Sequence, residues 1–98
     1  MLFLVSYRPR AGRMENEEGR ILDLFAKWKP PAGVAIKAHY VRADGGGLLI
    51  IDAESAVALL EGNATWQPFH DYETTPIVEV GEAVPALRRA VAWRESNR

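Results

Sequence analysis

Two histidines are the side chains of this sequence best suited to move protons near neutral pH, where imidazole titrates. His39 lies in the alternating segment VAIKAHYVR, residues 34–42, and His70 follows the aromatic stretch ATWQPF, residues 64–69. We take His39 as the candidate catalytic residue, since a histidine that faces an enclosed space can serve as acid, base or ligand. The sequence favours the alternative, a structural histidine at a subunit interface, because no residue fixes a chemical partner for it.

Aromatic and polar side chains complete a candidate binding set around His39. Trp66 lies outside regular structure and is a good pocket residue, whereas Trp28 falls on a helical stripe and is predicted to be core. Tyr7 or Glu73 would pair with His39 in acid–base chemistry. The predicted ligand-binding residues are Tyr7, Lys37, His39, Trp66, His70, Tyr72 and Glu73.

The segment HDYE, residues 70–73, together with His39 offers nitrogen and oxygen ligands of the kind that divalent metals bind. Its spacing matches no metal signature, and a loop corner with capping carboxylates is far more common. We therefore predict neither a metal nor a cofactor. The chain has no cysteine, which excludes disulfides, thiol catalysis and thiolate metal sites, and no Ser-His-Asp order is credible.

The composition is that of one globular domain over residues 1–98, with 48% apolar and 26% charged residues. A net charge of −1 gives no electrostatic case for nucleic acid. No segment approaches the roughly 20 apolar residues that span a bilayer, and MLFLVSY, residues 1–7, is too short for the core of a signal peptide. We expect a cytoplasmic protein with no nucleic-acid or membrane partner.

Apolar periodicity and turn residues divide the chain into seven elements. Strands are predicted at residues 2–7, 34–42, 48–52 and 72–80, and helices at 14–29, 54–63 and 81–98. The three glycines of ADGGG, residues 43–47, are followed by a strand, so they indicate a hairpin rather than a phosphate loop, which a helix would have to follow. Asp44-Gly45 is the expected place for positive φ angles.

The predicted order, β-α-β-β-α-β and then a helix, is the ferredoxin-like arrangement, an α+β fold with an antiparallel sheet and two helices on one face. Two strands, LFLV at residues 2–5 and LLII at residues 48–51, are apolar on both faces, whereas two helices cover only one. A second copy of the chain, paired sheet to sheet in a dimeric α/β barrel, is the simplest cover for the other face. The alternative is a C-terminal helix that folds back over it.

Strict alternation assigns each side chain of the second strand to a face of the sheet. Val34, Ile36, Ala38 and Tyr40 share one face, and Ala35, Lys37, His39 and Val41 share the other. If the first set packs against the helices, His39 points into the space between the sheet and its cover. A single β-bulge would reverse this assignment, and a position of His39 packed beneath either helix would end its predicted functional role outright.

Three stretches of the chain, LFLVSY, GVAIKAHYVRADGGGLLIID and DYETTPIVEV, resemble the uncharacterised family catalogued as domain of unknown function 3303. The family shares a glycine-rich hairpin and an acidic-aromatic-Glu-x-Thr-Pro stretch, which is here Asp71, Tyr72, Glu73, Thr75 and Pro76. The resemblance implies a ferredoxin-like, dimeric α/β-barrel type of fold. It implies no activity, because none is established for the family.

Two functions of different classes remain open. The first is a non-catalytic homodimer that binds a small apolar or aromatic molecule between its sheets. The alternative is a cofactor-independent enzyme, similar to monooxygenases or isomerases on barrels of this type, with His39 as acid or base. A cavity of a few hundred Å³ to which His39 is exposed would favour the enzyme, and an inter-sheet space filled by side chains would count against it.

Overall fold

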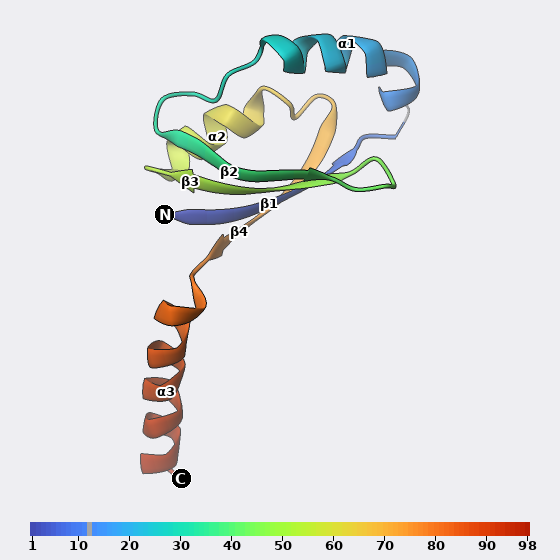
Figure 1. Ribbon diagram of the computed structural model, residues 1–98. Helices are drawn as coiled ribbons and strands as arrows, with labels where there is room; N and C mark the ends of the chain where they lie inside the picture. The colour runs from blue at the N-terminus through green and yellow to red at the C-terminus, as the bar shows by residue number, and fades with distance from the viewer. Residues whose placement is uncertain (12) are drawn as a thin grey trace.

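The protein has an α+β fold with a four-stranded antiparallel sheet and three helices (Figure 1). The computed structural model describes residues 1–11 and 13–98. The strands are β1 (Leu2–Pro9), β2 (Val34–Val41), β3 (Gly47–Ala53) and β4 (His70–Ile77), and the helices are α1 (Arg13–Lys27), α2 (Ala56–Ala64) and α3 (Val80–Ser96). The predicted order of strands and helices along the chain is confirmed.

The strands lie in the order β2-β3-β1-β4, and every neighbouring pair is antiparallel. α1 and α2 lie on one side of this sheet, and the opposite side is not covered by either helix (Figure 1). β1 pairs with both β3 and β4, so that Tyr7 lies beside Gly47 on one neighbour and beside Tyr72 on the other. The register therefore gathers side chains of three strands near one end of β1.

Local sequence signals explain where the first two helices begin and end. α1 stops at Lys27, shortly before Pro30, because a residue that precedes proline is disfavoured in the α region. Trp28 consequently lies just beyond the helix. α2 begins after Ser55, whose side-chain hydroxyl accepts a hydrogen bond from the backbone nitrogen of Ala58 at 3.1 Å and so caps the helix.

The hydrophobic core lies between the sheet and α2. Alternate residues of β1 and β3 point toward this helix, and Val5 at the centre is fully buried. Burial of each large apolar side chain stabilises the fold by roughly 1.5–3 kcal/mol. The main cluster comprises Phe3, Val5, Leu49, Ile51, Ala53 and Leu59, and a second cluster comprises Ile21, Trp66 and Phe69.

β2 contains a β-bulge, which inserts one extra residue against β3. The register passes from the pair Ile36 and Ile51 directly to the pair Ala38 and Ile50, so that Lys37 is the extra residue. Such a bulge reverses the facing of every side chain that follows it, because side chains alternate with a period of two.

His39 is the residue most affected by this reversal. Beyond the bulge it pairs with the buried Leu49 and shares the helix-facing side of the sheet with it. Tyr40, predicted to pack against the helices, is instead 65% exposed. The alternation predicted for this strand is therefore wrong from Lys37 onward.

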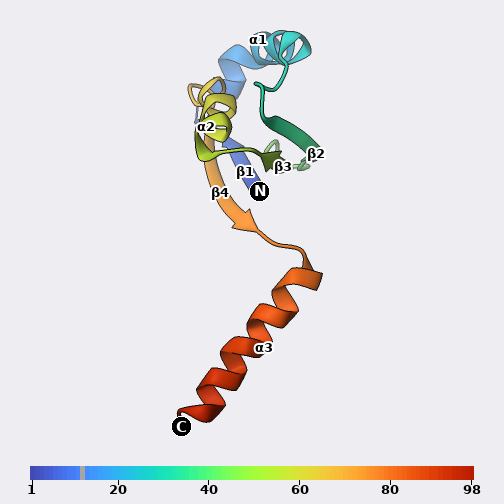
Figure 2. The same cartoon turned by 90° about the vertical axis from the view of Figure 1, so that its left-hand side faces the viewer.

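α3 projects away from the sheet (Figures 1 and 2). None of its residues is buried, and the radius of gyration of the chain is 17.5 Å, whereas a compact domain of this length has about 13 Å. The alternative in which the C-terminal helix folds back over the sheet is wrong. β4 spans His70–Ile77, and α3 already begins at Val80. The strand predicted over residues 72–80 therefore begins and ends too late in the sequence.

The glycine-rich segment between β2 and β3 forms the predicted hairpin. Gly45 has a φ of +94°, which a side chain disfavours, whereas Asp44 does not share the positive φ that the sequence predicted for it. The Asp44 carboxylate instead accepts a hydrogen bond from the backbone nitrogen of Gly46 at 3.1 Å. Gly47 lies under the ring of Tyr7, and a Cβ atom there would overlap that ring. Packing, rather than the turn, therefore requires glycine at position 47.

Gly47→Ala should lower the free energy of unfolding by about 1–3 kcal/mol, the usual cost of adding a methyl group to filled space. Gly19→Ala is the matched control, because Gly19 is exposed on α1 and no atom lies within 4 Å of the added Cβ. This change should raise the free energy of unfolding by up to about 1 kcal/mol. Urea denaturation measures both, and an unchanged stability in Gly47→Ala would contradict the packing of Tyr7 over β3.

Candidate functional site

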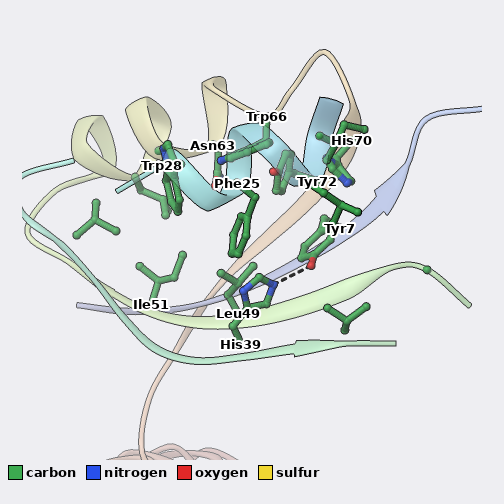
Figure 3. Close-up of a pocket in the computed structure, with 17 residues that line it drawn as sticks. Tyr7, Phe25, Trp28, His39, Leu49, Ile51, Asn63, Trp66, His70 and Tyr72 are labelled. Carbon is green, nitrogen blue, oxygen red and sulfur yellow. Dashed lines mark hydrogen bonds between the residues drawn. The ribbon is translucent and has the colours of Figure 1, made fainter. Parts of the chain in front are cut away.

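A cavity of about 260 Å³ lies between the sheet and the helices α1 and α2 (Figure 3). Its walls are mostly apolar and aromatic. Leu49 and Ile51 of β3 line it from the sheet, and Phe25 and Trp28 line it from α1 and the segment just after it. Trp66, from the segment between α2 and β4, closes the same side. The molecule thus has an internal space on the helix side of its sheet.

Three aromatic rings pack against one another on the helix side of this cavity. The ring centroids of Phe25 and Trp28 are 6.4 Å apart and stacked, and those of Trp28 and Trp66 are 5.7 Å apart with one edge toward the other face. These arrangements are favourable geometries for aromatic pairs. Phe25 is nonetheless 47% exposed and the neighbouring Leu22 is 62% exposed. Both also line the cavity, so it opens to solvent beside α1.

A hydrogen bond between two polar side chains marks the sheet side of the cavity. The Tyr7 hydroxyl lies 2.7 Å from Nε2 of His39 (Figure 3). The two residues come from β1 and β2, which are separated by β3. Tyr7 can reach across because Gly47 on β3 has no side chain, and His39 meets it because the bulge at Lys37 turns it to this face.

The polar groups of the cavity are uncharged at neutral pH. Burial lowers the pKa of both His39 and His70 below the ordinary value of 6.5. Burial also raises the pKa of Tyr7 and, together with the nearby Tyr7, that of Tyr72. Among the residues that the structure describes, no aspartate, glutamate, lysine or arginine lines the cavity. The site therefore offers hydrogen bonds but no countercharge.

His70 adds an unsatisfied polar atom to the same end of the cavity. It is only 8% exposed, and its Nδ1 is buried without a hydrogen-bond partner in the described part of the chain. Its ring centroid lies 5.1 Å from that of Tyr7, in an edge-to-face arrangement. Buried polar atoms are generally hydrogen-bonded, so an unsatisfied one calls for an explanation such as a bound water, local strain or a functional role.

The structure brings together five of the seven residues that the sequence predicted for ligand binding. Tyr7, His39, Trp66, His70 and Tyr72 all line the cavity.

The other two predicted residues lie elsewhere. Lys37 is exposed at the bulge. Glu73 is exposed and alternates with Tyr72 along β4, so it points to the opposite side of the sheet. Of the two acid–base partners considered for His39, Tyr7 therefore has the required geometry and Glu73 does not.

The predicted position of His39 between two sheets is wrong. The ring lies on the helix side, where its centroid is 5.8 Å from that of Phe25 of α1. This position excludes the role that we predicted for His39 in an inter-sheet space. The predicted discriminating feature, a cavity of a few hundred Å³ lined by His39, is nevertheless present on the other face of the sheet.

Several residues of the cavity were not singled out by sequence reasoning. Trp28 was assigned to a helical core stripe, yet Trp28 and the nearby Phe25 both line the cavity. Asn63, at the end of the helix predicted over residues 54–63, lines the cavity as well. The aromatic residues of the stripe could have indicated a pocket, because large aromatic side chains line binding sites as well as fill cores.

The structure does not place the carboxylates that a metal site would need beside the histidines of the cavity. His70 and Tyr72 face the cavity, whereas Asp71 is exposed and its carboxylate lies 3.3 Å from the guanidinium of Arg10. Among the side chains that the structure describes, there is no group of three or more histidine, aspartate or glutamate residues placed to hold a metal ion. Within the described part of the chain, no helix is long and apolar enough to cross a membrane.

Comparison with known proteins identifies the family of the chain. The family model described as Domain of unknown function (DUF3303) matches residues 1–91. The chain therefore belongs to this family, as the three quoted stretches suggested. No curated protein and no solved structure matches the chain.

Acidification should destabilise the fold through the two buried histidines. The unfolded rings titrate near 6.5, so below that pH the unfolded state binds more protons than the folded state. The stability contributed by the neutral rings is complete above pH 6.5 and is lost as the pH falls through their lower folded-state pKa values. Asp44 and Asp52, whose pKa values are lowered from 3.8, change the free energy of unfolding only in more acidic solution.

Thermal melts from about pH 8 to about pH 5 measure this effect. The Tm should be constant down to about pH 6.5 and should then fall, and the fall should be shallower in His39→Gln. A Tm that rises on acidification, or an equal slope in the variant, would contradict the burial of a neutral His39.

Proposed function

We propose that this member of the DUF3303 family binds a small apolar or aromatic molecule in the cavity between its sheet and the helices α1 and α2. The observation that carries the proposal is the cavity itself. It combines a largely apolar wall, three aromatic rings and one convergent polar pair, Tyr7 and His39. This is the usual composition of a small-molecule site, in which apolar surface supplies affinity and a few polar groups set orientation.

The volume of the cavity supports a ligand larger than a single benzene ring. An apolar cavity of roughly 150 Å³ is sufficient to hold benzene in another protein. The cavity here is about 260 Å³ and opens beside α1, where Leu22 and Phe25 are partly exposed. A fused two-ring aromatic compound is therefore a reasonable probe of the site.

Equilibrium dialysis with 2-naphthol tests binding. We expect one molecule per chain and a loss of affinity of about tenfold or more in Leu49→Trp, whose larger ring would occupy the cavity. Val57→Trp is the matched control, because Val57 is 75% exposed on α2 and is not a lining residue. Equal affinity in wild type and Leu49→Trp, with both proteins folded by circular dichroism, would overturn the proposed site.

A cofactor-independent enzyme is the second candidate, and the hydrogen bond between Tyr7 and His39 favours it. Burial lowers the pKa of His39 and so keeps its imidazole in the neutral form that a general base requires, and the Tyr7 hydroxyl at 2.7 Å can relay a proton to or from it. His39 would act as the base and Tyr7 as the acid in a proton transfer on a bound aromatic molecule. In that case His39→Gln would abolish turnover, while binding of the probe would persist.

We further propose that the chain forms a ferredoxin-like homodimer of the dimeric α/β-barrel type, with sheet facing sheet. The side of the sheet that α1 and α2 leave uncovered carries a row of partly exposed apolar side chains. They are Leu2, Leu4, Leu48, Ile50 and Ile77, with Tyr40 beside them. Contiguous exposed apolar surface of this kind is typical of an interface.

The projecting helix α3 supports self-association independently. Val80, Val84, Leu87 and Val91 form an exposed stripe at helical spacing along it. In proteins most of the stability of a helix comes from packing of its apolar face rather than from helix propensity, so packing of this stripe is expected to contribute to the stability of α3. A second copy of the chain would provide the missing surface.

Light scattering coupled to gel filtration tests the dimer. We expect wild-type protein at twice the 10.9 kDa of one chain. Ile50→Lys should shift it toward monomer, because an unpaired charge at the centre of the interface is costly to bury. Val57→Lys places the same charge on the outer surface of α2 and should leave the dimer intact. A wild-type monomer at micromolar concentration would refute sheet-to-sheet pairing.

A further inference from the structure

We infer that the molecule held in this cavity is an uncharged aromatic compound that carries a hydroxyl group, such as a phenol or a naphthol. This inference rests on the proposed function and names the chemical class of its ligand. It combines three observations on the described residues: the absence of charge in the lining, the aromatic wall, and the hydrogen-bonding capacity of Tyr7 and His39.

The lack of charge in the lining excludes ionic ligands. No acidic or basic side chain of the described residues lines the cavity, and burial favours the neutral forms of His39 and His70. A carboxylate or an ammonium group would leave water without a countercharge to replace its hydration, which is strongly unfavourable. A neutral ligand meets no such penalty.

The positions of the rings favour a flat ligand. Phe25, Trp28 and Trp66 stand on the helix side, while Leu49 and the His39–Tyr7 pair face them from the sheet (Figure 3). Aromatic rings stack or meet edge to face with centroids about 4.5–7 Å apart. Because Phe25 already meets His39 edge to face at 5.8 Å, a planar ring would lie beside that contact, between Trp28 and Trp66 on the helix side and Leu49 on the sheet side, and would present one edge to the polar pair.

The hydrogen-bonding capacity of Tyr7 and His39 favours a ligand that carries a hydroxyl group. If Nδ1 of His39 carries the ring proton, Tyr7 donates to Nε2, and the phenolic oxygen of Tyr7 can only accept from a ligand. If Nε2 carries the proton, it donates to Tyr7, and the Tyr7 hydroxyl is free to donate. At the Tyr7 oxygen, a carbonyl on the ligand can bond only in the second arrangement, whereas an N–H group is accommodated best in the first, where no donor from His39 competes for the lone pairs. A hydroxyl both donates and accepts, so it satisfies either one.

The experiment compares three probes of similar size by equilibrium dialysis: 2-naphthol, 2-methylnaphthalene and 2-naphthoate. In wild type, 2-naphthoate should bind about a hundredfold more weakly than 2-naphthol, or not at all. Tyr7→Phe should weaken binding of 2-naphthol by about two- to tenfold, the usual effect of one lost hydrogen bond, and should leave 2-methylnaphthalene unchanged. His39→Gln, which alters the other half of the pair, should likewise weaken binding of 2-naphthol and leave 2-methylnaphthalene unchanged.

Tyr40→Phe is the matched control, because it removes the same hydroxyl from a tyrosine that is 65% exposed and does not line the cavity. It should change none of the affinities. If no probe binds to wild type, the proposed function fails. If the probes bind but 2-naphthoate binds as well as 2-naphthol, or if both Tyr7→Phe and His39→Gln affect 2-naphthol and 2-methylnaphthalene equally, the binding function stands and the inferred ligand class is overturned.

Discussion

One extra residue in β2 determines the chemistry of the candidate site. The bulge at Lys37 turns His39 from the uncovered side of the sheet to the helix side, where it pairs in register with Leu49. Without the bulge, strict alternation would place Tyr40 under the helices and leave His39 on the outer face. Bulges commonly re-aim side chains near functional sites, and here the result is an imidazole inside an apolar cavity.

The hydrogen bond that His39 makes there depends on a second local feature. Tyr7 and His39 belong to strands that are not neighbours, and the ring of Tyr7 spans the strand between them only because Gly47 has no side chain. Bulge and glycine thus act together to form one polar pair. Because burial keeps both partners uncharged, the pair can orient a neutral ligand or exchange a proton with it.

Sequence reasoning predicts the larger features of this protein well, because they arise from repeated signals. Apolar periodicity locates each helix and strand, and strand signals on both sides of the glycine run identify the hairpin. Tyr7, Trp66 and His70 were assigned to a binding site on the basis of residue type, and all three line the cavity.

The remaining features depend on single residues or on distant parts of the chain. No glycine or proline in VAIKAHYV signals the bulge, so the face of His39 could not be predicted. Alternation along β4 already places Tyr72 and Glu73 on opposite faces, but which of the two faces the helices follows from the register with β1. The projection of α3 leaves its apolar stripe exposed, and local periodicity carries no information about which surface such a stripe contacts.

Neighbouring residues of β3 distinguish ligand binding on the helix side of the sheet from binding on its uncovered side. Leu49 and Ile51 line the cavity, whereas Leu48 and Ile50 alternate with them on the opposite face. The measurement is methyl NMR of protein labelled at leucine and isoleucine, titrated with 2-naphthol. We expect saturable shifts at Leu49 and Ile51 with little change at Leu48 and Ile50, and shifts confined to Leu48 and Ile50 would contradict ligand binding on the helix side of the sheet.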